Sequence, residues 1–251
     1  MIARTGTDAS TADLPLAELT LAGPDAAAFL QGYLTCDMDA LDEAAGLPMA
    51  YCNIKGRVLA NGWASGRADR VSLIVDASVA EALSAHLSKY LLFSRSKLER
   101  GPNRALLGTS RGSAIELPPL GRVLAPADDD GPFANLDRLC IDTGFAVVSA
   151  PVSERFLPQM LGLTDIGAVN FDKGCYLGQE VVARAQYRGE VKRRIRRYRY
   201  RGGHPAIGAP TSPSGVVVHA TADDGAGGLA LVVTGSSASE LSGPDCTLET
   251  I

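Results

Sequence analysis

The sequence predicts an α+β protein that ends in a small β-rich module. Strand-like runs joined by short turns recur along most of the chain, with a few helical patterns between them. After Gly202, short apolar runs between glycines and prolines replace any helical period, which is typical of a β-barrel-like module of about 50 residues. At 251 residues the chain is long for one compact unit. We therefore expect a polar, frayed leader over residues 1–13, a body over 14–201 and the module over 202–251.

The first elements follow from short apolar runs and from turn residues. Residues 14–22 alternate loosely and predict a strand. Gly23-Pro24-Asp25 then opens a short helix to Gln31, because proline costs nothing in the first turn, and Gly32 ends it. Three further strands are expected: Met49–Ile54, Val58–Ala64 (joined to the first by the turn Lys55-Gly56-Arg57) and Val71–Val75.

The clearest helical period follows. Asp76 is a suitable N-cap, and apolar residues spaced by four (Val79, Leu83, Leu87, Leu91) predict a helix to Leu92. Pro151 is expected to begin a second helix that reaches about Leu161. The remaining short apolar runs are expected to be strands: Ala105–Gly108, Leu120–Leu124, Leu136–Ile141, Phe145–Val148, Val216–Val218 and Leu229–Val233.

Composition excludes several classes of protein. Apolar residues make up 46% and charged residues 21%, the balance of a globular domain, and no run approaches the roughly 18 apolar residues of a membrane helix. The five cysteines form no CxxC pair, which argues against a zinc ribbon or a disulfide framework and favours a reducing, cytoplasmic setting. Three scattered histidines offer little for a metal site. GxGxxG and P-loop motifs are absent.

Positive charge is concentrated in one segment. Residues 184–201 hold nine basic side chains and one acid, Glu190, so the segment carries +8 while the whole chain carries −4. This pattern predicts a site for an anion, a phosphate or nucleic acid, or else a solvated strand face paired with acids elsewhere. The tract RRIRRYRYR could stack tyrosines on bases, and it equally fits an ordinary antiparallel strand with Ile195 facing inward.

Cys175 is the cysteine with a suggestive setting. It precedes a helical pattern, and Lys173 stands two residues before it. A helix N-terminus and an ammonium both favour a thiolate, so Cys175 is a candidate nucleophile, sulfur carrier or metal-ligand donor. The alternative is a buried, inert cysteine. Gln179 and Glu180 fall in the first helical turn, where Glu180 either complements the helix dipole or binds an NH-rich ligand.

The segment Lys173-Gly174-Cys175-Tyr176-Leu177-Gly178-Gln179-Glu180 resembles the KGCYxGQE signature of the folate-binding YgfZ family, which is related to the glycine-cleavage T-protein. Further matches follow the family's order over about residues 15 to 200. They are Gly23-Pro24-Asp25 with Phe29-Leu30-Gln31-Gly32 and Thr35-Cys36-Asp37, then Asn53 to Arg57, Tyr90 to Arg95, Pro158 to Phe171, and Ala183-Arg184 with Tyr187-Arg188-Gly189.

The resemblance implies a ring of mixed α/β subdomains around a central channel that takes a folate, with a small C-terminal β-barrel. It implies a role in assembly or maintenance of iron–sulfur proteins, with altered tRNA modification as a consequence. Cys175 would be the reactive thiol and Lys173 its tuning group. Tetrahydrofolate is the expected cofactor, and no resident metal is expected. Tyr176, Gln179 and Glu180 would position the loop and the ligand, and Asn53 and Arg57 are further expected cofactor-binding residues. Arg184, Arg188 and Lys192 would meet the glutamate tail of a folate or a partner's acidic surface.

Two departures from the family pattern concern the channel. Leucines (Leu16 and Leu136) stand near positions where some members have tryptophan, and the single tryptophan is Trp63. Stacking on a pteridine would then fall to Tyr or Phe. Asp37 is the position that invites comparison with the folate-binding carboxylate of the aminomethyltransferases. One alternative function is a tetrahydrofolate-dependent one-carbon transferase, the form an enzymatic activity would take. Another is an RNA-binding module using Arg184 to Arg201. Iron–sulfur client proteins are the expected partners, and neither nucleic acid nor membrane is.

Overall fold

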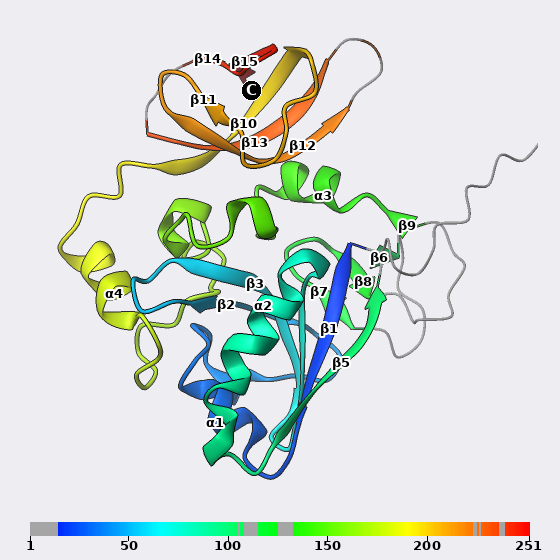
Figure 1. Cartoon of the computed structure of the whole chain (residues 1–251), viewed down its shortest axis with the longest axis vertical. Coiled ribbons are helices and arrows are strands. Elements are labelled where there is room, and N and C mark those ends of the chain that lie inside the picture. The colour runs from blue at the N-terminus through cyan, green and yellow to red at the C-terminus, as the bar shows by residue number, and fades with distance from the viewer. Residues whose placement is uncertain are drawn as a thin grey trace, which may run out of the picture.

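A computed structural model describes residues 15–104, 106–107, 115–124, 133–222, 225, 227–235 and 239–251. The leader and the loop over 127–131 lie outside the described residues. Figure 1 shows a body built around an antiparallel sheet, with a second, strongly curved sheet beyond one end of it. The α+β class that the sequence predicts is confirmed.

The main sheet has the strand order β2-β3-β4-β1-β5 and all its pairings are antiparallel. The four strands predicted in this region are confirmed as the first four in this order. β5 is an additional strand at the edge of the sheet. The strands are β1 (Leu16–Ala22), β2 (Leu47–Cys52), β3 (Val58–Arg67), β4 (Arg70–Asp76) and β5 (Lys97–Arg104). β3 is the longest of these strands. One turn joins its start to β2, and another joins its end to β4.

Two helices cover one face of this sheet (Figure 1). The first is α1 (Ala26–Gln31), and the second is α2 (Ala77–Ser88), whose N-cap Asp76 accepts a hydrogen bond from the Ser78 N–H at 2.9 Å. Val79, Leu83 and Leu87 are buried, as their spacing predicts. The helix ends four residues before Leu92, and the apolar residues Leu91–Phe93 form a separate 3-10 turn.

The opposite face holds a core in which the indole of Trp63 packs edge-on against Phe145, 5.3 Å between ring centroids. Small strands flank this core in the order β7-β8-β6-β9. They are β6 (Leu106–Leu107), β7 (Glu116–Leu117), β8 (Arg122–Leu124) and β9 (Phe133–Ala134). Of the predicted strands here, Leu120–Leu124 is found in part as β8. Ala105–Gly108 is described only at 106–107.

The predicted strand over Leu136–Ile141 is wrong, because these residues form helix α3 (Leu136–Thr143). The Asn135 side chain caps its start by accepting the Arg138 N–H at 2.8 Å, and Gly144 ends it in the left-handed region at φ 74°. An ion pair four residues apart, Arg138 to Asp142 at 2.9 Å, adds to it.

The segment 145–148 is buried and extended, yet it is not a strand. A side chain, rather than a neighbouring strand, makes the hydrogen bonds to its backbone N–H and carbonyl groups. Asn61 on β3 donates to the Ala146 carbonyl at 2.8 Å and accepts from the Val148 N–H at 2.8 Å. The helix expected from Pro151 to Leu161 is also wrong, since the segment holds only two 3-10 turns, Ala150–Val152 and Pro158–Leu161.

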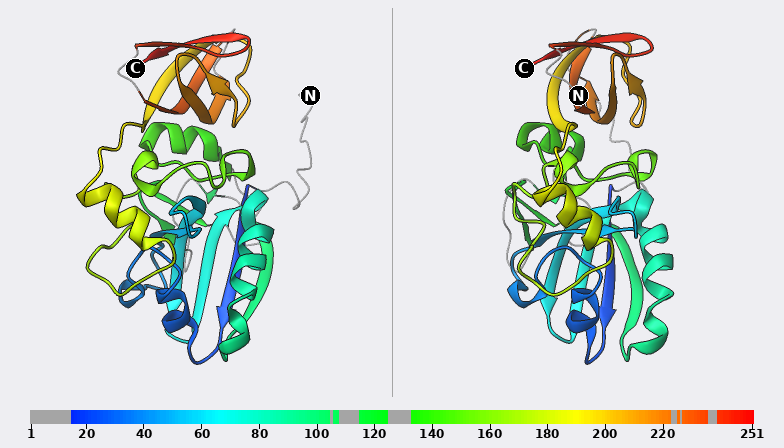
Figure 2. Two further views of the ribbon diagram at one scale, coloured as in Figure 1. Left: turned by 60° about the vertical axis from the view of Figure 1, so that its left-hand side comes forward. Right: turned by 90° about the vertical axis from the view of Figure 1, so that its left-hand side faces the viewer.

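The C-terminal sheet is nearly closed, as expected of a barrel-like module. Its order is β11-β12-β13-β10-β15-β14, and a bridge between Ser212 and Ser242 links the ends of the order. Its strands are β10 (Arg194–Gly202), β11 (Pro210–Thr211), β12 (Gly215–Ala222), β13 (Gly227–Thr234), β14 (Glu240–Ser242) and β15 (Cys246–Thr250). β10, which precedes the predicted start of the module at residue 202, is a strand of this sheet. α3 lies beneath this sheet (Figure 2).

Candidate functional site

The signature segment forms a loop that Lys173 holds against the end of α1. The Lys173 Nζ donates to three backbone carbonyls, those of Gln31 (2.8 Å), Leu34 (2.8 Å) and Cys36 (2.6 Å). Burial lowers the pKa of Lys173 from its ordinary value, more than the nearby Cys36 and Asp37 raise it. Since an ammonium has three protons, these bonds use all of them. Lys173 is therefore committed to holding the loop, and the expectation that it tunes the Cys175 thiol finds no contact to support it.

The loop then passes the turn between β2 and β3 at very short range. Gly178 has φ 82°, and a Cβ there would lie 2.3 Å from the Asn53 carbonyl oxygen and 3.2 Å from the Gly56 Cα. Only glycine meets both conditions without strain. Two glycines thus set the distance between the signature loop and this turn, and Figures 1 and 2 show the following helix beside the ends of β2 and β3.

That helix, α4 (Gln179–Tyr187), has Gly178 as its N-cap. Cys175 lies three residues before this N-cap and is therefore too far from the helix N-terminus for the predicted effect of the helix dipole on the thiol. The thiol is nevertheless exposed, while Cys36, Cys52, Cys140 and Cys246 are buried. The predicted alternative of a buried, inert Cys175 is wrong.

Cys175 lies in a hollow of about 530 Å³ where the signature loop meets the ends of α1 and α2. Other signature residues line it, together with side chains not singled out from the sequence: Tyr33, Ile54 and Tyr90. The rings of Tyr33 and Tyr90 lie 4.9 Å apart, and Phe29 stands 4.7 Å from Tyr33. A signal for Tyr90 existed in the sequence, namely the apolar run Tyr90 to Phe93 beyond the predicted core positions of α2. Tyr33 gave none.

Three expected site residues surround the thiol. Tyr176 is 5% exposed, and its hydroxyl has no hydrogen-bond partner among the described residues. The Gln179 Oε1 accepts from the Tyr176 N–H at 3.2 Å, which closes the loop onto the first residue of α4. Glu180 is in the first helical turn and pairs with Arg184, 2.8 Å between Oε1 and Nη2. It is thus placed both at the helix dipole and at the hollow.

Asn53 and Arg57 line a neighbouring hollow of about 620 Å³ and organise the β2–β3 turn. The Asn53 Oδ1 accepts from the N–H groups of Lys55 (2.9 Å) and Arg57 (3.0 Å), and its Nδ2 donates to Glu154 at 2.7 Å. Arg57 donates to the Arg155 carbonyl at 2.9 Å. Glu154 adopts φ 59°, which is strained for a residue with a side chain.

Arg184 and Arg188 line a third hollow, of about 420 Å³, along α4 with Glu180 and Tyr187. Both arginines are exposed, as is Lys192 in the connection to β10. The structure therefore distributes the expected site residues over three adjacent hollows: the thiol and loop in the middle, Asn53 and Arg57 on one side, the arginines on the other.

The tyrosines of the basic tract face away from solvent. Tyr198 and Tyr200 are buried in the core of the C-terminal sheet. They therefore cannot stack on bases, which removes the feature that favoured RNA binding by this tract. Its strand prediction is confirmed, and Ile195 packs partly buried against the main core.

Leu16 and Leu136, which stand near the family's channel tryptophans, are buried core residues here. Trp63 is also buried, and its Nε1–H donates to the Pro118 carbonyl. Asp37 accepts from the Gln31 Nε2 at 2.9 Å and from the Asp39 N–H at 3.3 Å, and these bonds lower its pKa. Its carboxylate thus has protein partners at the end of α1.

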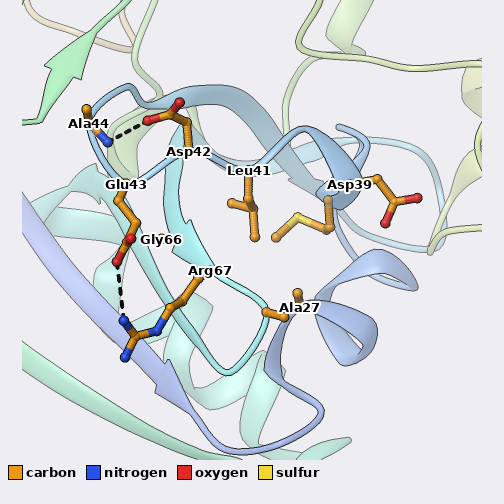
Figure 3. Close-up of a pocket in the computed structure, with 10 residues that line it drawn as sticks. Ala27, Asp39, Leu41, Asp42, Glu43, Ala44, Gly66 and Arg67 are labelled. Atoms are coloured by element: carbon orange, nitrogen blue, oxygen red, sulfur yellow. Dashed lines mark hydrogen bonds and ion pairs between the residues drawn. The ribbon is translucent and has the colours of Figure 1, made fainter.

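Another hollow, of about 630 Å³, lies at the opposite end of β3 (Figure 3). Asp39, Asp42 and Glu43 line it with Arg67, whose Nη1 stands 3.6 Å from the Glu43 Oε1. Three carboxylates against one guanidinium make it unsuitable for an anionic ligand such as folate.

Comparison with known proteins identifies the family. The chain is 30% identical over 237 residues to the tRNA-modifying protein YgfZ of Cronobacter sakazakii, an alignment covering 74% of this chain and 72% of that protein. The chain belongs to the YgfZ family. It is also 29% identical over 219 residues to the tRNA-modifying protein YgfZ of Yersinia pestis (strain Pestoides F), covering 70% of this chain and 66% of that protein. It thus spans slightly less than two thirds of that relative's length. No family model matches it.

A fold similar to that of this YgfZ-family chain is found in a protein with a different name. The solved structure of glycine cleavage system aminomethyltransferase T from Bartonella henselae superposes with a TM-score of 0.65 over 94% of this chain and 82% of that one. At 16% identity this is a likeness of fold alone. Among the described residues of the YgfZ-family chain, no helix combines the length and apolar character needed to cross a bilayer.

Proposed function

We propose that this chain is a folate-binding accessory factor for the assembly or maintenance of iron–sulfur proteins, with tRNA modification as a downstream consequence. The observation that carries the proposal is the exposed thiol of Cys175 in a hollow walled by tyrosines. The name of the relatives, tRNA-modifying protein, is a second support. Such a factor would act in the cytoplasm, where free thiols persist.

The residues at this hollow fit a folate. Its volume of about 530 Å³ lies within the usual range for small-molecule sites. Tyr33 and Tyr90 offer aromatic faces for a pteridine in place of the missing tryptophans. Arg184 and Arg188, in the hollow that shares Glu180, match the carboxylates of a glutamate tail.

The chain's own residues would divide the work. Bound tetrahydrofolate would supply a carrier of one-carbon units. Tyr33, Tyr90 and Tyr176 would orient its ring, and Gln179 and Glu180 would face its polar edge. The Cys175 thiol would act as a nucleophile or sulfur ligand toward an iron–sulfur client, with Lys173 keeping the loop in place.

Calorimetric titration with tetrahydrofolate tests the binding half of the proposal. Wild-type protein should bind saturably with a Kd near micromolar, about −8 kcal/mol. Tyr33→Ala should weaken binding at least tenfold, and Cys175→Ala should bind as wild type. No binding by correctly folded wild-type protein would remove folate from the proposal.

Thiolated tRNA in cells that depend on this chain tests the other half. Cys175→Ala should lower the thiolated fraction and the activity of a cluster-containing enzyme together. Full support by Cys175→Ala would overturn the role of the thiol. Loss of thiolated tRNA with normal cluster enzymes would point instead to a direct action on tRNA.

A further inference from the structure

Exposed large apolar side chains gather around the Cys175 hollow. Six such side chains are found among the described residues. Ile54 (72% exposed) and Tyr90 line the hollow itself, and Leu92 (82%) and Phe93 (94%) follow Tyr90 in the same turn. Tyr187 lines the next hollow along α4. The sixth, Ile251 (64%), directly follows β15 of the C-terminal sheet, and its N–H donates to the Arg197 carbonyl. A cluster of this kind marks an interaction surface.

The three adjacent hollows share lining residues, and we take them together as one groove. Ile54 lines both the hollow over the β2–β3 turn and the one around Cys175, and Glu180 lines both the latter and the hollow along α4. We call this the signature groove. It runs from Arg155 through Cys175 to Arg188, so a ligand longer than a folate would contact both flanks at once.

The flanks of the signature groove are positively charged on a chain whose net charge is −4. Five basic side chains line it, against two acids: Lys55, Arg57, Arg155, Arg184 and Arg188, with Glu154 and Glu180. Glu180 is already paired with Arg184. Arg57 and Arg155 donate to backbone carbonyls, which do not neutralise their charge. The groove therefore attracts an acidic occupant.

We propose that the signature groove docks an acidic segment of a partner polypeptide, whose apolar side chains pack on Ile54 and Phe93. The exposed aliphatic side chains of Ile54 and Leu92 favour a polypeptide over a nucleic acid, because they provide apolar anchors that cannot stack on bases. Docking there would bring the partner over the Cys175 thiol. The inference rests on the proposed function and deepens it by naming the chemistry of the partner's contact surface.

Peptide binding measured by fluorescence anisotropy tests the proposal on the full chain. The probe is a labelled 12-residue peptide of glutamates interspersed with leucine and phenylalanine, compared with the same peptide carrying lysine for glutamate. The acidic peptide should bind at least tenfold more tightly than the lysine peptide. Equal binding of the two would overturn the proposal.

Variants locate the binding. Ile54→Asp should weaken the acidic peptide at least tenfold, whereas its matched control Ile251→Asp should not. Lys55→Glu with Arg188→Glu should weaken the acidic peptide and strengthen the lysine peptide. The control Arg70→Glu, at the first residue of β4, should do neither. Circular dichroism confirms that each variant is folded. Binding unchanged by Ile54→Asp and by the double charge reversal would overturn the proposal.

Two further outcomes would also overturn it. A single-stranded RNA that displaces the acidic peptide, with affinity falling steeply in salt, would make the groove a nucleic-acid site. Self-association of the wild type, abolished by Ile54→Asp, would make a second copy of this chain the occupant. Tetrahydrofolate titration of Phe93→Asp separates this inference from the proposed function, because Phe93 is not among the residues that line the Cys175 hollow. This variant should lose the acidic peptide and keep folate binding.

Discussion

His219 of β12 and Asp137 of α3 form a pair in which Nδ1 lies 2.7 Å from Oδ1. The histidine is 2% exposed and the carboxylate about 39%. The contact joins the C-terminal sheet to the helix beneath it. Burial works against the charge of the imidazole, but the adjacent Cys140 and Asp137 outweigh it and raise the pKa of His219 to about 10. The hydrogen bond to Asp137 thus favours the protonated form of the imidazole.

This pair predicts a loss of stability in alkali. The pKa of His219 is about 10 in the folded protein, against about 6.5 for an unfolded histidine. Its contribution is thus fully present below pH 6.5 and is lost as pH rises through about 10. Denaturant unfolding between pH 6 and pH 10 should show the free energy of unfolding falling by a few kcal/mol more in wild type than in His219→Gln. Parallel curves for the two proteins would contradict the pairing.

Replacing Lys173 should destabilise the protein. Lys173→Met removes an ammonium that donates to three carbonyls and leaves them without that donor. The expected loss is about 2–4 kcal/mol in urea unfolding. Lys173→Arg should not restore it, because a planar guanidinium cannot direct three bonds to carbonyls placed around a point charge. Lys192→Met, an exposed control, should stay within about 0.5 kcal/mol of wild type.

The two glycines of the signature differ in what they tolerate. Gly178→Ala forces a side chain into the left-handed region and against the Asn53 carbonyl, so it should cost about 2 kcal/mol or more. Gly174 has no atom within 4 Å of the position its Cβ would take, so Gly174→Ala should cost less than about 1 kcal/mol. Thermal melts of the two variants decide this. An equal effect would mean that the close approach of the loop to the β2–β3 turn is not required.

Thiol accessibility separates Cys175 from the other cysteines. With Ellman's reagent, the native protein should show one fast-reacting thiol, and five after denaturation. Cys175→Ala should remove the fast phase. A second fast phase in native protein would show that another cysteine reaches solvent.

Much of the fold follows from local sequence signals. Of the wrong secondary-structure predictions, that for α3 has a local cause, and that for residues 145–148 has a distant one. The N-cap Asp76 and the spacing of four in α2 could be read directly. α3 carried equally good signals, Asn135 before it and Gly144 after it, but the β-like residues between them favoured a strand. For Phe145 to Val148 the outcome depended on Asn61, more than eighty residues away, whose amide substitutes for a neighbouring strand. No local pattern contains that information.

The candidate site shows the same division. The sequence left the exposure of the Cys175 thiol open, whereas Glu180 lies in the first helical turn as predicted. The tyrosines around the thiol come from two other helix ends, and only the tertiary structure brings Tyr33 and Tyr90 to Cys175. Lys173 was expected to act on the thiol because it is near in sequence, yet its partners are residues 31, 34 and 36.

The commitment of Lys173 to those carbonyls changes what the signature can diagnose. The lysine of the motif indicates that the loop is anchored to α1, and the cysteine indicates that the loop carries an exposed thiol. Either residue can therefore be substituted without the other. A chain that kept the lysine and replaced the cysteine would preserve this loop architecture without the exposed thiol, so a match to the motif that lacks the cysteine is evidence for the fold and not for a function of the thiol.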